Sequence, residues 1–480
     1  MNQNSKIKVL VKDTGLFAIS NFGSKILIFL LTPLYTSILT AEEYGIADLI
    51  TNTINFLYPI LTLAIADATL RYALDKENDK SKVLNNSLLL TFISIGLLLI
   101  IYPFINHFND MLRTYWGIFA VTYALFNIHN CIANFIKGMR QTVLFAAQGL
   151  IQTLSIIICN VLLLVVFKIG LDGYLISIIA GYAISTLVMI FGGKVYTYVN
   201  LKKLDWKLIK DMIGYSIPMI PTLLAWAINT SIDKYMIIGF VGLGASGVYS
   251  VAHKIPTIFT IVMSMFTQAW QISAIANYGS EDESSYYTKV YGALNIVSML
   301  GCLLIMLLCK WFASILFVKD FYVAWRYVPI LTVSTMFASH GGFLASAFRA
   351  AKKTNSLFIS VLVGSVMNVI LNWVLIKSFG VMGAAIATAI SFIIIWLFRI
   401  VLVQGIVYVR VNWIITIVSY LFFISSAIIV AIDVPHAPIF VLLNSSIIVL
   451  LNYKDIRPIL AGLLKIVHHR IRPKVENLNG

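Results

Sequence analysis

The sequence predicts an all-α polytopic membrane protein with about fourteen transmembrane helices. Of its 480 residues, 60% are hydrophobic and only 11% are charged, and the mean hydropathy is +0.90. Soluble domains contain about 25% charged residues, so these values exclude a packed aqueous fold. Apolar runs of about 20 residues, long enough to cross a hydrocarbon core of about 30 Å, recur from one end of the chain to the other.

Each apolar run is expected to form one helix, with bounds accurate to about 2–4 residues. The first run is too long for the core of a signal peptide, and no small-residue cleavage site interrupts it, so we expect it to be retained. The predicted spans cover residues 14–39, 45–72, 83–105, 115–137, 143–168, 173–197, 212–240, 245–276, 287–317, 325–349, 355–377, 382–405, 411–431 and 436–452.

The distribution of Lys and Arg predicts the orientation of these spans. With the N-terminus inside, 26 of the 35 Lys and Arg residues fall in cytoplasmic segments, 6 fall in outer loops, and three (Lys25, Lys234 and Lys254) fall within spans. Because cytoplasmic loops carry the excess of positive charge, both termini are predicted to be cytoplasmic.

Composition also limits the classes of partner and chemistry. The net charge of +15 comes mainly from the cytoplasmic rim, where anionic lipid headgroups lie, so we expect contact with membrane lipids and not with nucleic acid. The four cysteines fall in or at the ends of spans without metal-ligand spacing, which favours buried thiols over disulfides or a metal site. The sequence contains no phosphate loop, zinc motif or nucleophile constellation, so we predict no bound cofactor and a protein that is not an enzyme.

The chain contains an internal repeat. FIKGMRQT (Phe135–Thr142) is echoed by FRAAKKT (Phe348–Thr354), and KIGLDG (Lys168–Gly173) by KSFGVMG (Lys377–Gly383). EEYGIADL (42–49) similarly corresponds to ASGVYSVA (245–252), and the separation is about 200–210 residues throughout. Because both halves start from the cytoplasm, the repeats are parallel, and transporters built this way often bind substrate where the halves meet.

The repeat predicts the domain organisation, with two similar six-helix bundles around a central cavity and two further helices. Its parts are a first bundle (1–196), a basic cytoplasmic linker (197–211), a second bundle (212–405), two appended spans (406–452) and a basic cytoplasmic tail (453–480).

Polar and small residues recur at helical spacing in the first two spans of each half, which predicts that these four helices face the cavity. The alternative is that such stripes only join helices through hydrogen bonds. That alternative does not account for Lys25 near the middle of its span, since a lysine there costs at least about 2.5–3.5 kcal/mol unless it is solvated or paired. The polar members of the stripes include Asn21, Lys25, Asp48, Asn55, Asn229, Asp233, Lys254, Gln268 and Gln271.

Three segments resemble motifs of Wzx-type polysaccharide flippases, which belong to the multidrug/oligosaccharidyl-lipid/polysaccharide exporter superfamily. They are TSILTAEEYGIADL (Thr36–Leu49), DKYMIIGFVGLGASGVYSVAHKI (Asp233–Ile255) and FGVMGAAIAT (Phe379–Thr388). The resemblance covers essentially the whole chain, and the Asp-Lys-Tyr…Gly-x-Tyr-Ser…Lys string is its most specific part. Charges in the cavity vary among such proteins, so roles are carried over to this chain by position.

The resemblance implies a flippase that moves an oligosaccharide repeat unit on undecaprenyl pyrophosphate across the cytoplasmic (inner) membrane of a bacterium by alternating access, for surface polysaccharide biosynthesis. It also implies a polysaccharide polymerase and chain-length proteins as partners. Lys25 and Lys254 are then expected to bind the pyrophosphate, because bare phosphate cannot cross hydrocarbon. The expected substrate-binding residues are Lys25, Lys254, Lys234, Asn21, Asn55, Asn229, Gln268 and Gln271.

Asp48 and Asp233 are intramembrane carboxylates and candidate sites for coupling to H⁺ or Na⁺, although structural pairing with a nearby lysine explains them equally well. Three other functions compete with the flippase assignment. A peptidoglycan-precursor (lipid II) flippase differs only in the attached sugar, which the sequence does not specify. A cation-coupled drug antiporter requires a cavity rich in carboxylates, whereas here lysines oppose them. A glycosyl polymerase usually requires a large outer loop, which is not predicted.

Overall fold

The structure, a computed structural model, describes residues 23–108, 113–200, 203–453 and 457. Every regular element in these ranges is helical. Within them, ten helices are long and apolar enough to cross a membrane, or up to eleven if one bent pair forms a single span. Each predicted span overlaps at least one helix, so the all-α polytopic membrane fold is confirmed.

The chain separates into two compact units. Unit 1 comprises Met1–Ile238, Gly242–Gly247 and Val318–Asp320, and unit 2 comprises Gly239–Val241, Val248–Phe317 and Phe321–Gly480. This division follows contacts between residues, whereas the boundaries proposed above follow the sequence repeat, and those boundaries stay a prediction.

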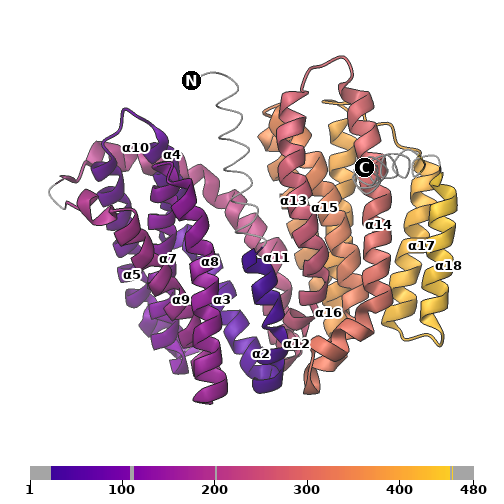
Figure 1. Ribbon diagram of the computed structural model, residues 1–480, viewed down its shortest axis with the longest axis horizontal. Coiled ribbons are helices and arrows are strands. Elements are labelled where there is room, and N and C mark those ends of the chain that lie inside the picture. Colours follow the sequence, from indigo (N-terminus) through magenta and orange to yellow (C-terminus); the bar gives the residue numbers. More distant parts are fainter. Residues whose placement is uncertain (1–22, 109–112, 201–202, 454–456, 458–480) are drawn as a thin grey trace, which may run out of the picture. The chain divides into compact units, whose positions relative to one another are not determined.

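Unit 1 is organised around α7, which packs against α4, α5, α8 and α9. Its helices (Figure 1) are a segment at 23–30, α2 (Thr32–Ile38), α3 (Ala41–Leu61), α4 (Ile65–Leu74), α5 (Lys80–Phe108), α7 (Trp116–Gly138), α8 (Thr142–Asn160), the π-helix η1 (Val161–Val166), α9 (Leu171–Gly192), η2 (Val195–Tyr198), α10 (Trp206–Ser216), η4 (Ile217–Met219) and α11 (Ile220–Phe240) as far as Ile238.

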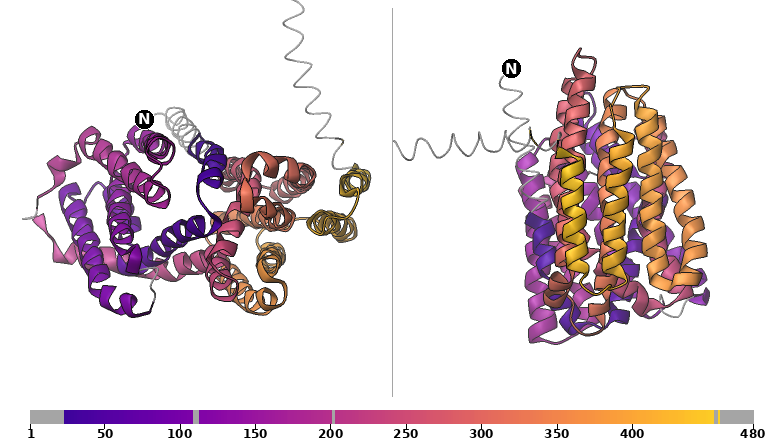
Figure 2. Two further views of the ribbon diagram at one scale, coloured as in Figure 1. Left: turned by 90° about the horizontal axis from the view of Figure 1, so that it is seen from below. Right: turned by 90° about the vertical axis from the view of Figure 1, so that its right-hand side faces the viewer.

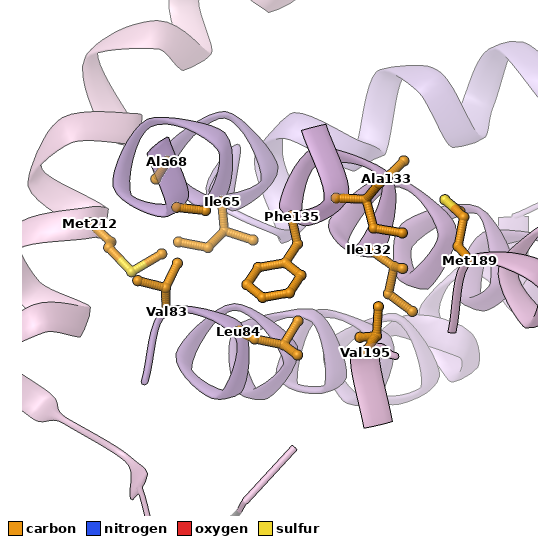
Figure 3. Close-up of a cluster of buried hydrophobic side chains, with 12 residues drawn as sticks. Ile65, Ala68, Val83, Leu84, Ile132, Ala133, Phe135, Met189, Val195 and Met212 are labelled. Atoms are coloured by element: carbon orange, nitrogen blue, oxygen red, sulfur yellow. The ribbon is translucent and has the colours of Figure 1, made fainter. Parts of the chain in front are cut away.

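One apolar cluster joins α4, α5, α7, α9 and α10 of unit 1. Phe135 of α7 lies between Ile65 of α4 and Leu84 of α5, and Met189 of α9 and Met212 of α10 close the two ends of the cluster (Figure 3). Lipid tails are as apolar as these side chains, so close packing holds such a cluster together more than removal from lipid does.

The linker segment is fixed to unit 1 by polar contacts. Asp205 caps α10, because its carboxylate accepts hydrogen bonds from the backbone N–H groups of Lys207 at 3.1 Å and Leu208 at 3.2 Å. The same carboxylate pairs with Lys82 at 2.9 Å, and this hydrogen bond lowers the pKa of Asp205. Residues 201 and 202 of the linker lie outside the described residues.

Unit 2 is centred on α15, whose most apolar stretch is 78% buried and which packs against α13, α14, α16 and α17. The paired helices α17 and α18 lie side by side (Figure 2). The bounds are α12 (Leu243–Ala252) from Val248 onward, α13 (Lys254–Ala276), α14 (Glu283–Leu316), η5 (Lys319–Arg326) from Phe321 onward, α15 (Val328–Ala350), α16 (Thr354–Val403), α17 (Trp413–Ala431) and α18 (Ala437–Leu451).

Two helix breaks refine the predicted spans. The span expected at 45–72 is bent by 61° between α3 and α4, where Leu63 (φ 53°) and Ala64 (φ 52°) both adopt left-handed backbone. Left-handed conformations cost an L-residue roughly 1–2 kcal/mol, and no glycine signals this break in the sequence. Conversely, α16 contains both predicted spans 355–377 and 382–405, which join at a kink at Gly380 (φ 56°, ψ −136°).

The repeat seen in the sequence recurs in the backbone. Gly170 (φ 72°, ψ −139°) has nearly the same conformation as Gly380, which lies 210 positions later. The turns after α7 and α15 also match, with left-handed residues at Arg140 (φ 59°) and Lys352 (φ 58°). In the first turn the N–H of Gln141 donates to the carbonyl of Ile136 at 3.2 Å, and in the second Lys353 donates to Phe348 at 2.8 Å. Both turns therefore end their helices with the same Schellman-type cap.

The third repeated segment forms a close helix crossing within unit 1. A Cβ atom on Gly45 would collide with the carbonyl oxygen of Leu243, and a Cβ atom on Gly247 would collide with that of Ala41. Ala41 precedes Gly45 by four residues, as Leu243 precedes Gly247, so the contact is reciprocal. The two repeated glycines allow α3 and the first turn of α12 to touch backbone to backbone.

Candidate functional site

The candidate site lies within unit 1 and is formed by α3 and α11. Helix α3 starts with a capping box, in which the Thr40 side chain accepts from the Glu43 N–H at 3.2 Å and the Glu43 carboxylate accepts from the Thr40 N–H at 2.8 Å. From this fixed start, Asp48, Asn52 and Asn55 follow at intervals of four and three residues and share one face of the helix.

An ion pair connects the two helices. Lys234 of α11 places its Nζ 2.9 Å from Oδ2 and 3.1 Å from Oδ1 of Asp48. The two side chains are only 15% and 20% exposed, so solvent screens the pair weakly. Of the three lysines that the sequence predicts to lie within the membrane, Lys234 is therefore the one that is neutralised by a carboxylate of the described residues.

Asn52 extends this pair into a network. Its Nδ2 donates to Asp48 Oδ2 at 2.9 Å and to the Asp48 carbonyl at 2.7 Å, and its Oδ1 accepts from Ser231 Oγ at 2.9 Å. The next residues along the two helices, Thr53 of α3 and Tyr235 of α11, also form a hydrogen bond between their hydroxyl groups at 2.9 Å. The resulting chain of hydrogen bonds and the ion pair fix the relative register of α3 and α11.

A cavity of about 400 Å³ adjoins this network. None of its lining residues is charged, and several are aromatic or carry a hydroxyl or amide group. The ring of Tyr58 is supported by Phe126 of α7, with ring centroids 5.5 Å apart. The lining consists of Asn52, Asn55, Phe56, Tyr58 and Pro59 from α3 and of Leu223, Trp226, Ala227, Thr230 and Ser231 from α11.

The cavity uses a face of α11 that the sequence pattern did not single out. The predicted stripe of this span contains Asn229 and Asp233, which are 1% and 2% exposed and do not line the cavity. The residues of α11 that line the cavity instead include Trp226, Thr230 and Ser231. The sequence does contain a signal for this face. Lys234 follows Ser231 by three residues and Thr230 by four, so the three residues share one side of the helix.

The other two intramembrane lysines differ from Lys234. Lys25 is exposed on the helical segment 23–30 of unit 1, and Lys254 is half-buried at the first residue of α13 in unit 2. No carboxylate of the described residues forms an ion pair with either lysine; Asn21, predicted to lie beside Lys25, falls outside them.

The remaining predicted site residues are spread over both units. Gln268 and Gln271 are half-buried on α13. Asn55 is exposed in the cavity lining. Neither polar atom of the Asn229 side chain has a hydrogen-bond partner in the part of the chain that the structure describes, and Asp233 lies one turn further on the same helix. Substrate binding by these residues stays a prediction.

Comparison with known protein families places the chain. The family model described as "Polysaccharide biosynthesis protein" matches residues 10–271, which is more than half of the chain. This match includes the α3–α11 network and both Lys25 and Lys254.

Two archaeal proteins are similar to this chain over most of its length. An uncharacterized membrane protein of Methanocaldococcus jannaschii is 24% identical over 81% of this chain and 96% of its own length. A probable low-salt glycan biosynthesis flippase of Haloferax volcanii is 24% identical over 68% of this chain and 70% of its own length.

Solved structures share the fold. The lipid II flippase MurJ in an inward closed conformation has a TM-score of 0.68 at 15% identity, covering 94% of this chain and 99% of MurJ. An inward-facing multidrug resistance transporter of the MATE family has a TM-score of 0.69 at 14% identity, covering 80% of this chain and 95% of the transporter. The resemblance to Wzx-type flippases is thus confirmed, and the chain is a multi-pass membrane protein that belongs to the polysaccharide biosynthesis protein family of the multidrug/oligosaccharidyl-lipid/polysaccharide exporter superfamily.

Proposed function

We propose that this protein is a flippase for lipid-linked oligosaccharides, and that it moves repeat units on undecaprenyl pyrophosphate from the inner to the outer leaflet of the cytoplasmic membrane by alternating access. The family match and the glycan flippase among the relatives support this substrate class. Both chain termini are then cytoplasmic, as the distribution of Lys and Arg predicts.

The observation that carries the proposal is that only one of the three lysines predicted to lie within the membrane has an ion-pair partner among the described residues. Lys234 is neutralised by Asp48 at 2.9 Å, whereas Lys25 and Lys254 have no ion-pair partner among the described residues. A lysine without a partner on an apolar helix costs free energy in a membrane. Binding of an anionic ligand offsets that cost and gives the lysine a function. The pyrophosphate of the lipid carrier is such a ligand, and Lys25 and Lys254 each supply one cation for it.

During transport the protein also has to shield the charged pyrophosphate and the sugar hydroxyl groups of the substrate from the hydrocarbon core of the membrane. Moving bare pyrophosphate through the bilayer is prohibitive, because an ion that leaves water without compensation loses tens of kcal/mol of solvation. A lysine at the headgroup offsets part of this loss, and amide and hydroxyl side chains such as those of Asn55 and Thr230 suit the hydroxyl groups of a sugar.

The test is glycan export in cells, normalised to the amount of inserted protein. A charge-assisted hydrogen bond contributes roughly 1.5–3 kcal/mol, so Lys25→Gln or Lys254→Gln is expected to weaken binding about tenfold to a hundredfold. Lys25→Arg and Lys254→Arg should retain much of the export, since phosphate mainly requires the positive charge.

Lys377→Gln is the matched control, because Lys377 lies over the ring of Trp373 at 4.0 Å and serves neither proposed role. It should export normally. Full export by the double variant Lys25→Gln/Lys254→Gln would overturn the cationic role of both lysines.

The alternatives differ in the cargo. A lipid II flippase uses the same pyrophosphate chemistry, and the two are distinguished by asking whether the protein supports growth of cells that lack their own lipid II flippase. A cation-coupled drug antiporter requires a cavity rich in carboxylates, whereas the lining of the α3–α11 cavity contains none and Asp48 beside it is paired with Lys234. Coupling of the return step to H⁺ or Na⁺ is proposed for Asp233, which is buried one turn from Asn229 on the same helix.

A further inference from the structure

We infer that the cavity between α3 and α11 binds one sugar ring of the lipid-linked glycan, with Trp226 as the stacking surface and Asn55 and Thr230 as the groups that contact hydroxyls. This inference rests on the proposed function and deepens it, because it assigns the sugar to residues of unit 1 other than the lysines proposed for the pyrophosphate.

The size and lining of the cavity fit an uncharged polar ring. Its volume of about 400 Å³ lies within the range of about 300–1,000 Å³ that is typical of small-molecule sites. None of its ten lining residues carries a charge, so the lining supplies no cation to pair with a phosphate. An acyl chain fits it poorly as well, because amides and hydroxyls from both helices line the cavity and would have to give up water without new partners.

Trp226 supplies the apolar surface that a sugar ring needs. This residue is 57% exposed although it lines the cavity, so the indole is available to a ligand. Sugar rings have one face of C–H bonds that packs against the π-face of an aromatic ring. The indole is the largest such surface among the side chains, and it loses little conformational entropy on binding.

Two polar groups in the lining are available for hydroxyls. Asn55 is exposed and has no hydrogen-bond partner among the described residues, so its amide offers both a donor and an acceptor. Thr230 donates to the carbonyl of Trp226 at 2.9 Å, which leaves its oxygen free to accept a hydrogen bond. Both residues lie within one turn of an aromatic side chain, Asn55 beside Phe56 and Thr230 one turn after Trp226.

The Asp48–Lys234 pair acts on this cavity as a positioning device. Asp48 accepts both contacts of the Asn52 amide nitrogen, and the Asn52 oxygen holds Ser231, so two residues of the cavity wall are fixed from outside it. With the hydrogen-bonding groups of Asn52 satisfied in this way, the wall keeps its shape, and the open groups of Asn55 and Thr230 are left to contact the ligand.

The experiment measures binding of two probes to the purified full-length protein in detergent. One probe is undecaprenyl pyrophosphate without sugar, and the other is the same lipid with its glycan, extracted from cells that produce the protein. Trp226→Ala is expected to weaken binding of the glycan-bearing probe about tenfold and to leave binding of the bare lipid unchanged. Trp226→Phe should retain most of the affinity, because it keeps an aromatic face.

Two further variants guard against a general effect on folding. Trp311→Ala is the matched control, since Trp311 is also 57% exposed but lies on α14 in unit 2, and it should bind both probes normally. Asn55→Leu removes the amide without changing the size of the side chain much, and it should weaken binding of the glycan-bearing probe alone.

The outcomes separate this inference from the proposed function. If the wild type binds both probes equally well, or if Trp226→Ala weakens both to the same extent, the cavity does not bind the sugar and the inference is wrong while the flippase proposal stands. Equal weakening of both probes by Trp226→Ala would indicate that the cavity binds the lipid chain. If the wild type binds neither probe, the proposed function itself fails.

Discussion

Gly45 of α3 and Gly247 of α12 face each other so closely that neither position has room for a Cβ atom. The Cβ of an alanine at position 45 would lie 3.3 Å from the backbone nitrogen of Gly247, and that of an alanine at 247 would lie 3.0 Å from the nitrogen of Gly45. Each would also overlap a carbonyl oxygen, that of Leu243 or Ala41. The obstacle is backbone on both sides, so rotation of a side chain cannot relieve it.

Gly45→Ala and Gly247→Ala should each destabilise the protein by about 1–3 kcal/mol, because a methyl group forced into a packed crossing displaces backbone. The measurement is the midpoint of thermal unfolding in detergent, followed by size-exclusion chromatography. Gly244→Ala is the control on the same helix, since its Cβ would meet Ala41 and Glu42 at an ordinary 3.9 Å. Equal midpoints for all three variants would contradict the crossing.

The repeated glycines 170 and 380 provide a second test. Both have positive φ, and nothing lies within 4 Å of the place that a Cβ atom would occupy, so alanine there is opposed by the backbone conformation alone. Gly170→Ala and Gly380→Ala should each cost of the order of 1–3 kcal/mol in unfolding free energy. Gly96→Ala on α5 and Gly342→Ala on α15 meet equally open space at helical positions, and they should be neutral or stabilising. A loss of stability in the second pair as large as in the first would show that the conformation is not the cause.

The ion pair between Asp48 and Lys234 predicts non-additive mutations. Asp48→Asn alone leaves Lys234 buried without a counter-charge, and breaking such a pair typically costs about 3–5 kcal/mol. Lys234→Met alone should behave similarly. The double variant Asp48→Leu/Lys234→Met removes both charges and should recover most of the stability. A double-mutant cycle on thermal unfolding measures this coupling, and simple addition of the single effects would rule out the pair.

Transport with and without an ion gradient tests the coupling role of the carboxylates. Asp233→Asn should abolish the response of glycan export to a proton or sodium gradient, because it removes the group that exchanges the ion, while the amide keeps the size of the side chain. Asp48→Asn should reduce export mainly through the lost pairing with Lys234. Normal gradient-dependent export by both variants would exclude a coupling role for either residue.

Orientation in the membrane can be tested at the linker. Lys203 pairs with Asp79 at 3.3 Å, and its side chain is 46% exposed, so a cysteine in its place should be reachable and cost little stability. In a cysteine-free background, Lys203→Cys should resist a membrane-impermeant thiol reagent in intact cells and react after the cells are opened. Labelling in intact cells would invert the predicted orientation.

The sequence determined the class of the protein, the positions of its helices and its internal repeat. These features depend on local properties: a bilayer requires apolar runs of a certain length, and a turn such as that at Gly170 or Gly380 requires a residue that tolerates positive φ. The bend at Leu63 and Ala64 was not predictable in this way, because those residue types normally continue a helix and tertiary packing imposes their left-handed backbone.

The tertiary structure decided which polar groups meet. Lys234 finds Asp48 at a separation of 186 residues, although Asp233 is adjacent to it in sequence. It also decided that the cavity-lining face of α11 carries Trp226 and Thr230, and not Asn229. In a membrane both the lipid-facing and the buried sides of a helix are apolar, so periodicity shows that faces exist without showing which neighbour each one contacts. Only the packing of α3 against its partners turns a stripe of polar residues into a site.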